Sequence, residues 1–301
     1  MQTQLLDRPI LLLGAAGQVG MELVPRLAAL GRVVAATRAD ADLERAEELV
    51  ALVRRVEPAV VVNAAAYTAV DDAERDEARC LRVNTDAPAV LAQEAARLGA
   101  PIVHFSTNYV FDGNAATPYV EDDPIAPLGV YGATKAAGEV AVQAANPAHL
   151  ILRTSAVYAP TGRNFVRRIL ALAREREELQ VVDDQLVAPT PAFALADATV
   201  TMLGHLLAAR RDDLFGVYHL TSAGAATWFA VAERILALDP APGEQRTTRL
   251  RPVRSEAFPT PARRPLNGLL NNDKAMRRFG VALPSWDASL QRALAGDAVT
   301  T

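Results

Sequence analysis

The chain has 301 residues, which is enough to bury one large hydrophobic core or two smaller ones. Its net charge of −4 argues against general nucleic-acid binding, which requires a basic surface, and its single cysteine, Cys80, excludes an intrachain disulfide. The four histidines are scattered without the spacing of metal ligands, so we expect no bound metal.

The N-terminal segment, residues 1–8, is polar and holds an aspartate and two glutamines. A short apolar run over residues 9–13 follows it and ends at a glycine. This pattern matches neither a signal peptide nor a membrane span, so we expect a cytoplasmic protein that does not enter a membrane. The same run is typical of a strand buried on both faces of a parallel sheet.

A glycine-rich sequence, GAAGQVG at residues 14–20, comes directly after this strand. The apolar spacing that follows predicts a helix over residues 21–30 that ends at Gly31, and then a second strand over residues 32–36. Glycines let the backbone approach a pyrophosphate closely, and a helix N-terminus offers free N–H groups. The order of these elements therefore favours a dinucleotide site over a merely tight turn.

The residue that ends the second strand of such a unit selects between NAD and NADP. An acidic side chain there binds the ribose 2′-hydroxyl of NAD, whereas an arginine accommodates the 2′-phosphate of NADP. Thr37 and Arg38 occupy this place, so we expect NADPH as the cofactor. The alternative is that Arg38 is a solvated loop residue and that Asp40 or Asp42 binds NADH.

Strands and helices continue to alternate, with a helix predicted over residues 44–56, a strand over 59–62, a helix over 85–98 and a strand over 101–107. This alternation implies an α/β fold with a doubly wound parallel sheet of the Rossmann type. Ligands of such sheets bind beyond the carboxyl ends of the strands. The glycine loop, the small residues at 63–68 and the Ser-Thr pair at 106–107 all lie at such ends.

A proline-rich and acidic loop, residues 113–129, leads to Tyr131 and Lys135. If a helix begins here, the two side chains lie on one face, four residues apart. A free tyrosine titrates near pH ~10, and a nearby ammonium would stabilise its phenolate. The alternative for an isolated Y-x-x-x-K sequence is that the tyrosine and the lysine are only two neighbouring surface residues. The upstream nucleotide loop and the Ser-Thr pair instead favour a catalytic role for Tyr131 and Lys135.

The remaining elements suggest a smaller lobe built from separated segments. We predict strands over residues 149–154, 180–182 and 216–220, and helices over residues 166–176, 195–207 and 228–238. The expected division gives a dinucleotide-binding domain at 1–157, completed by 180–222. The expected substrate-binding lobe is discontinuous and C-terminal, and it comprises residues 158–179 and 223–301.

Ordered motifs along nearly the whole chain resemble those of the extended short-chain dehydrogenases/reductases, and more narrowly those of the dTDP-4-dehydrorhamnose reductase family. The motifs are GAAGQVG, VVNAAAYTAVDDAE, NTDAP, HFSTNYVFDG, PLGVYGATKAAGE, ILRTSAVY, RNF, VVDDQLVAPT, GVYHL, TWFAVA and TPARRPLN. The resemblance implies an oxidoreductase of dTDP-rhamnose and carbohydrate biosynthesis. It would use NADPH, with NADH possible, to reduce the C4 ketone of a nucleotide-linked 4-keto-6-deoxyhexose, as a monomer or homodimer.

The resemblance also assigns roles to individual residues. Tyr131 would donate a proton to the developing alkoxide, Lys135 would lower the pKa of that tyrosine and bind the nicotinamide ribose, and Thr107 would bind the substrate oxygen. With Tyr131 and Lys135, the cofactor site would comprise Gly14, Gly17, Gln18, Val19, Arg38, Asp42, Leu43, Ala64, Ala65, Ala66 and Tyr67. The substrate site would comprise Thr68, Val70, Ser106, Asn108, Tyr109 and Asn164, the last meeting the diphosphate at a helix start.

Several of these residues have a purely structural alternative. Thr107 could only cap a strand end, and Asn164 is a good helix N-cap with or without a ligand. His104 on a strand is expected to be a satisfied core residue. The arginines at 163, 167 and 168 could form a solvated helix face, and those at 263 and 264 could fix the tail.

Four positions depart from the family pattern. Asn108 stands where an aspartate is usual, Ala156 where a tryptophan is common, and Val187 where a glycine is frequent. These changes predict a working reductase with an altered hexose or an altered affinity. Some relatives dimerise through a metal held by glutamates, and Phe193 stands where one such glutamate would be expected, so we predict no metal.

Two other functions remain as alternatives. A dehydratase or epimerase is the nearest, but dehydration commonly needs an Asp-Glu pair beside the threonine, where this chain has Asn108 and Tyr109. The other is a regulatory subunit that binds NADP without turnover. The complete set of Thr107, Tyr131 and Lys135 argues against it, because a binding role needs no proton donor.

Overall fold

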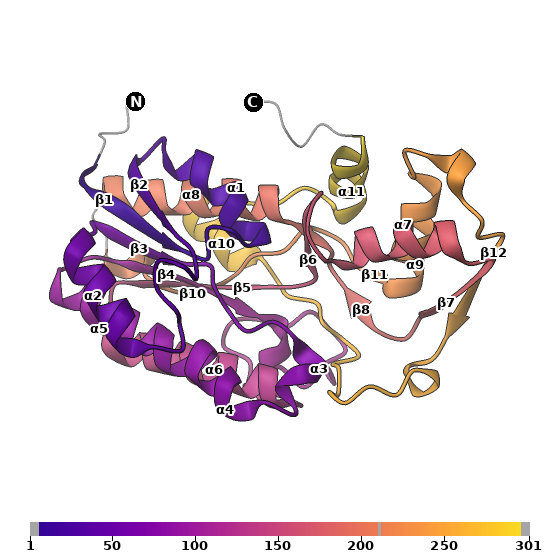
Figure 1. Cartoon of the computed structure of the whole chain (residues 1–301), viewed down its shortest axis with the longest axis horizontal. Coiled ribbons are helices and arrows are strands. Elements are labelled where there is room, and N and C mark those ends of the chain that lie inside the picture. Colours follow the sequence, from indigo (N-terminus) through magenta and orange to yellow (C-terminus); the bar gives the residue numbers. More distant parts are fainter. Residues whose placement is uncertain (1–5, 210–211, 296–301) are drawn as a thin grey trace.

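Six parallel strands form the main sheet, in the spatial order β2-β1-β3-β4-β5-β10 (Figure 1). The computed structural model describes residues 6–209 and 212–295. The strands are β1 (Leu6–Leu13), β2 (Gly31–Ala36), β3 (Val60–Asn63), β4 (Ile102–Thr107), β5 (His149–Thr154) and β10 (Gly216–His219). The strand order reverses between β1 and β3, so this is the doubly wound sheet that the sequence predicts.

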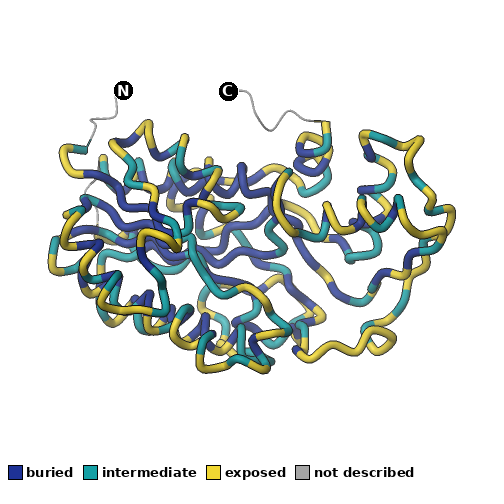
Figure 2. The backbone as a smooth tube through the Cα atoms, in the orientation of Figure 1, coloured by how far each residue is buried: buried dark blue, intermediate teal, exposed yellow. Residues whose placement is uncertain are grey.

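Helices cover both faces of this sheet (Figure 1). One face packs against α1 (Gln18–Leu27), α8 (Ala192–Ala209) and α10 (Asp273–Phe279), and the other against α2 (Ala46–Val56), α5 (Ala87–Arg97) and α6 (Val130–Ala145). In β1, Ile10 and Leu12 pack on the first side and Leu11 and Leu13 on the second. Burial on both faces explains the unbroken apolar run of this strand, and Figure 2 shows the buried strands inside more exposed helices.

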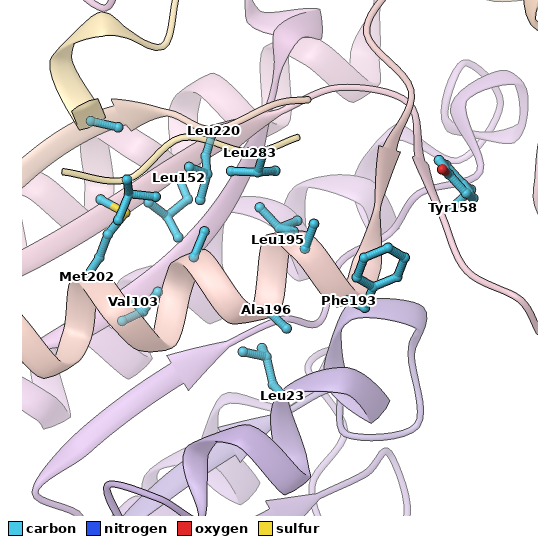
Figure 3. Packing of buried hydrophobic residues seen from close by; sticks show 14 of the residues in the cluster. Leu23, Val103, Leu152, Tyr158, Phe193, Leu195, Ala196, Met202, Leu220 and Leu283 are labelled. Carbon is cyan, nitrogen blue, oxygen red and sulfur yellow. The ribbon is translucent and has the colours of Figure 1, made fainter. Parts of the chain in front are cut away.

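Helix α8 supplies much of the first core. Figure 3 shows Phe193, Leu195, Ala196 and Met202 of this helix beside side chains of the sheet and of α1. Phe193 is fully buried here, and the guanidinium of Arg292 lies 4.7 Å from the centre of its ring. An apolar core position therefore occupies the place where the family resemblance led us to look for a metal-binding glutamate.

Two local predictions were incomplete or wrong. Gly31 does not end the first helix, because α1 stops at Leu27 and Gly31 already pairs with Leu6 in the sheet. Between β3 and α5 the chain forms helices α3 (Val70–Ala73) and α4 (Glu77–Leu81) and the π-helical turn η1 (Arg82–Asp86). This segment is short and acidic, so it shows no apolar periodicity that would have predicted these turns.

The smaller lobe contains helices α7 (Phe165–Glu175) and α9 (Trp228–Ala237), which pack on each other. The rings of Phe165 and Trp228 lie 4.4 Å apart, as expected for residues that fill this lobe. Short strands pair beside them: β7 (Glu178–Val182) with β12 (Arg249–Val253), β8 (Leu186–Val187) with β11 (Ala226–Thr227), and β6 (Val157–Tyr158) with β9 (Thr190–Pro191). Helix α11 (Trp286–Leu294) follows near the C-terminus.

The proposed division into two domains follows this pairing closely but not everywhere. Strand β10 completes the main sheet, in agreement with the assignment of residues 180–222 to the dinucleotide-binding part. Strand β7 pairs with β12 outside the main sheet, so residues 180–182 are better grouped with the lobe. The division into residues 1–157 with 180–222, and 158–179 with 223–301, remains a proposal, and the pairing of β7 with β12 and of β8 with β11 favours moving residues 180–187 to the lobe.

A C-terminal strap, defined here as residues 264–271, fastens the loop that precedes α6. Asn267 donates to the carbonyls of Ala115 and Thr117 at 2.8 and 3.0 Å. Tyr119 exchanges backbone hydrogen bonds with the strap, donating to Leu269 and accepting from Asn271. The predicted loop is therefore held in one position by chain from the far end of the sequence.

Among the described residues, we find no helix with the length and hydropathy needed to cross a membrane.

Candidate active site

A cavity of about 790 Å³ opens at the carboxyl ends of the central strands, between the main sheet and the lobe. It brings together every site residue predicted from the sequence except Lys135, which is buried and does not line it. The glycine loop, residues 64–70, residues 106–109, Tyr131 and Asn164 all contribute to its wall. Five segments of the sequence therefore meet at one place.

The glycine loop has the backbone geometry of a close-approach turn. Gly14 has φ +78°, and a Cβ added there would lie 2.7 Å from the backbone nitrogen of Ala65. A Cβ at Gly20 would collide with the carbonyl oxygen of Gly14. Gly17 precedes α1 and has no side chain to cap it, so the first N–H groups of this helix are open to an anion.

Charged residues surround the end of the cavity next to β2. Arg38 donates to Asp42 at 2.9 Å and to Glu44 at 3.0 Å, while its guanidinium remains largely exposed. Arg79 also donates to Glu44, at 2.8 Å. Asp40 instead accepts from the backbone and hydroxyl of Thr37. Of the two aspartates considered for NADH, only Asp42 thus lines the cavity.

Thr107 ends β4 and its hydroxyl accepts from the backbone nitrogen of Tyr109 at 3.2 Å. Thr107 therefore caps the backbone at the end of the strand, which is the purely structural role considered above. It also lines the cavity. Desolvation by the surrounding protein raises the pKa of Tyr131 to about 12, against a hydrogen bond with Thr107 that lowers it. Our expectation that the pKa of Tyr131 is lowered is thus not met, because burial outweighs the favourable contact.

Lys135 is fully buried, with 1% of its surface exposed, which excludes a surface pair with Tyr131. Its Nζ donates to the carbonyl of Phe105 at 2.6 Å and lies 3.2 Å from Nε2 of His104. Burial lowers the pKa of Lys135 to about 8, although the nearby carboxylate of Glu139 raises it. His104 is a buried residue with polar partners on both ring nitrogens, as expected.

Asn84 is a buried residue of this region that the sequence reasoning missed. Its amide accepts from the backbone nitrogen of Tyr67 at 2.9 Å and donates to the Tyr67 carbonyl and to Oγ1 of Thr134. It thereby joins the cavity wall to helix α6. The available signal was the NTDAP motif, but only the π-helical turn η1 aims this side chain at Tyr67.

Asn164 performs the structural role and lines the cavity as well. Its Oδ1 accepts from the backbone nitrogen of Arg167 at 3.1 Å, so it caps α7. Its Nδ2 donates to Gln18 of the glycine loop at 3.0 Å and thus connects the lobe to the dinucleotide-binding part. Arg163 lines the cavity, whereas Arg264 is fixed by Asp71 at 2.8 Å and so holds the tail.

Three residues that line the same cavity, Ser106, Thr154 and Ser155, carry buried hydroxyls that find no hydrogen-bond partner among the described residues. Buried polar groups in proteins are nearly always paired, so unpaired ones around a cavity indicate places for a ligand. Thr154 and Ser155 were not predicted, because nothing in the sequence distinguishes them from other residues at a strand end.

The family departures lie in different surroundings. Asn108 is buried beside the strap, where a Cβ at Gly268 would come within 2.6 Å of its Nδ2. Ala156 lines the cavity with φ +48°, an uncommon conformation for a residue other than glycine. Val187 packs instead into the main core. The described ranges contain no group of three or more His, Cys, Asp or Glu side chains that could hold a metal ion.

A family model described as "RmlD substrate binding domain" matches residues 8–298. The dTDP-4-dehydrorhamnose reductase of Burkholderia thailandensis is 47% identical over 282 residues, which cover 92% of this chain and 95% of that protein. A probable dTDP-4,6-dihydroxy-2-methyloxan-3-one 4-ketoreductase of Streptomyces antibioticus is 42% identical over 289 residues, which cover 94% of this chain and 93% of that protein.

A solved structure supports the same grouping. The dTDP-4-dehydrorhamnose reductase of Bacillus anthracis in complex with NADP superposes with a TM-score of 0.88 at 30% identity. The superposition covers 97% of this chain and all of that one.

Proposed function

Because this chain belongs to the RmlD substrate binding domain family, we propose that it reduces the C4 ketone of a dTDP-linked 4-keto-6-deoxyhexose with NADPH, for rhamnose or deoxysugar synthesis. The observation that carries this proposal is the meeting of Thr107, Tyr131 and a glycine-rich pyrophosphate loop around one cavity, above a buried Lys135. We further propose a cytoplasmic monomer or homodimer.

The residues present fit the cofactor. Gly14 and Gly17 leave room for a pyrophosphate beside the open N-terminus of α1, and the unpaired hydroxyls of Thr154 and Ser155 offer polar contacts deeper in the cavity. NADPH, when bound, supplies the hydride. Lys135 would hold a ribose hydroxyl, because its bond to the carbonyl of Phe105 uses only one of its N–H groups.

The proton for the new hydroxyl would come from Tyr131. Its raised pKa keeps the phenol protonated at neutral pH, and a developing alkoxide is basic enough to take the proton from it. Thr107 would donate its hydroxyl hydrogen to the same oxygen as negative charge builds up there.

The choice of hexose stays open within this class. The two relatives named above act on different dTDP-linked ketosugars by their names, and both are similar to this chain over nearly their whole length. Asn108 and Ala156 line the cavity and are the residues we expect to shift this choice.

The direct test is to monitor NADPH oxidation with a panel of 4-keto-6-deoxy sugar nucleotides. We expect turnover of at least one dTDP-linked 4-ketosugar, with a 4-hydroxy product. Consumption of the sugar without net NADPH oxidation would instead indicate an epimerase or dehydratase. Tight NADPH binding without turnover of any panel member would indicate a regulatory subunit.

The charged end of the cavity gives a test of cofactor preference. Replacing Arg38 with alanine is expected to raise KM for NADPH by about tenfold, because a charge-assisted bond to the 2′-phosphate is lost, and to change KM for NADH little. Steady-state kinetics with both cofactors measure this difference. Arg45→Ala is the matched control, since Arg45 pairs with Glu48 at 3.0 Å outside the cavity wall. An equal effect on both cofactors would remove Arg38 from 2′-phosphate recognition.

A further inference from the structure

Three buried polar side chains form a line that ends at Lys135, which follows Tyr131 by four residues on α6. Nδ2 of Asn63 lies 3.2 Å from Nδ1 of His104, and Nε2 of His104 lies 3.2 Å from Nζ of Lys135. Asn63 and His104 are direct partners across β3 and β4, so the pairing of the strands fixes their contact. All three side chains are at most 1% exposed, and water therefore cannot replace a missing hydrogen bond.

The direction of the hydrogen bonds in this line is determined from one end. Oδ1 of Asn63 accepts from the backbone nitrogen of Ala65 at 3.1 Å, so the NH₂ group of Asn63 faces His104. An NH₂ group only donates, and Nδ1 of His104 must accept from it. The ring is neutral, because burial holds the pKa of His104 well below its usual range, and its one hydrogen is therefore on Nε2.

With this arrangement, Nε2–H of His104 and the ammonium of Lys135 face each other, and both are hydrogen-bond donors. The N–H at Nε2 of His104 points at Nζ of Lys135, and an ammonium has three donors and no acceptor. A neutral amine has a lone pair that can accept this hydrogen bond. If the ring were reversed, the conflict would move to Asn63 and would not disappear. The line is thus fully satisfied only when Lys135 has lost a proton.

Other charged groups near Lys135 do not remove this conflict. Glu139 lies on the same helix, but it is fully buried in an ion pair with Arg153 of β5 at 2.7 Å. Cys80 of α4 is hydrogen-bonded to Thr134, and burial raises the pKa of its thiol. Within residues 6–209 and 212–295, no carboxylate lies at ion-pair distance from Nζ of Lys135.

We propose that His104, oriented by Asn63, is a positioning residue that favours the neutral amine of Lys135 and thereby makes Lys135 the source of the proton that restores Tyr131. The proposal rests on the proposed function for its role in turnover, but not for the hydrogen-bond arrangement. After Tyr131 has protonated the product, it is a phenolate. An N–H bond of Lys135 then breaks, an O–H bond of Tyr131 forms, directly or through a bridging hydroxyl, and the lone pair left on Nζ accepts from His104. After product release a proton from the solvent returns to Nζ along the same route, because Nζ itself is closed to water.

The composition of the chain makes a direct measurement possible. The sequence contains only two lysines, Lys135 and Lys274, so isotope-labelled lysine gives two side-chain NMR signals. In Lys274→Arg only the Lys135 signal remains, and this assigns both signals. We expect His104→Phe to raise the pKa of Lys135 by about one unit or more, because the opposing N–H is gone. His149→Phe, the same change at a half-buried histidine at the start of β5, should leave it at the wild-type value.

A second variant approaches the line from its other end. In Asn63→Asp the new carboxylate is expected to accept a hydrogen bond from Nδ1 of His104, so the ring hydrogen moves from Nε2 to Nδ1. Nε2 then accepts from the ammonium of Lys135, and the pKa of Lys135 rises further. In both variants the alkaline limb of the kcat profile should move to higher pH together with the NMR titration. Loss of packing alone would lower kcat or stability without moving this limb.

Three outcomes would overturn the inference. One is a wild-type histidine signal that shows His104 with its hydrogen on Nδ1, and this needs no variant. Another is a Lys135 pKa near the unperturbed value of ~10.4 in the wild-type protein. The third is a Lys135 titration that does not change in folded His104→Phe. Because the NMR readouts require no substrate, they stand even if the panel of sugar nucleotides shows no turnover.

Discussion

Replacing Tyr131 with phenylalanine is expected to lower kcat by about 10²- to 10⁴-fold, the usual contribution of a positioned proton donor. The change removes one oxygen atom and keeps the ring, which packs edge-on against Tyr109 with ring centres 5.6 Å apart. NADPH binding should remain close to that of the wild type, because the glycine loop and the charged end of the cavity are untouched. Single-turnover kinetics and fluorescence titration with NADPH measure the two quantities separately.

Tyr109→Phe is the matched control for this experiment, since it removes a phenol from the same cavity. We expect it to change KM for the sugar nucleotide, with kcat within a few-fold of the wild type. An unchanged kcat in Tyr131→Phe would exclude Tyr131 as the proton donor. An equal fall in both variants would mean that the loss reflects disturbed packing and not the missing proton.

Replacing Glu139 with glutamine is expected to lower the free energy of unfolding by about 3–5 kcal/mol, because it leaves a buried charge without its partner. Arg153 is nearly inaccessible to solvent and donates to both carboxylate oxygens of Glu139, at 2.7 to 3.1 Å. Its other recorded acceptor oxygen is the carbonyl of Glu121. A neutral amide keeps the shape of the site but removes the compensating charge. Denaturant unfolding followed by circular dichroism measures the difference.

Glu94→Gln provides the comparison. Glu94 also pairs with arginines, Arg54 at 2.8 Å and Arg97 at 3.1 Å, but more than half of each arginine side chain is exposed. Water can solvate these guanidinium groups once the carboxylate charge of Glu94 is lost. We therefore expect the free energy of unfolding to fall by less than about 1 kcal/mol. Similar losses in the two variants would show that burial does not govern the contribution of the Arg153 pair.

The dinucleotide-binding half of the fold could be predicted from the sequence because each signal there is local. The apolar run of β1, the glycines at 14, 17 and 20, and the helical spacing of α1 are contiguous, and their order alone specifies the unit. The small lobe could not be predicted in the same way. Its strands pair across long separations, such as β7 with β12, and they are too short or too exposed to show a period.

The catalytic centre shows the same limit. The spacing of Tyr131 and Lys135 places them on one face of a helix, but it does not say that the face is buried. Burial reverses the expected direction of the Tyr131 pKa shift. The contact of His104 with Lys135 depends on the register of β4 against its neighbours and on the packing of α6, neither of which a sequence pattern specifies.

The strap has a consequence for how this protein is made. Asn267 and its neighbours hold the loop that leads into Tyr131, although they lie far later in the sequence than this loop. A growing polypeptide can build its glycine loop early, but it cannot finish the reactive pocket until the strap has also left the ribosome. Prematurely terminated products therefore lack the support that fixes the phenol, and they should be inactive even where their first half has folded.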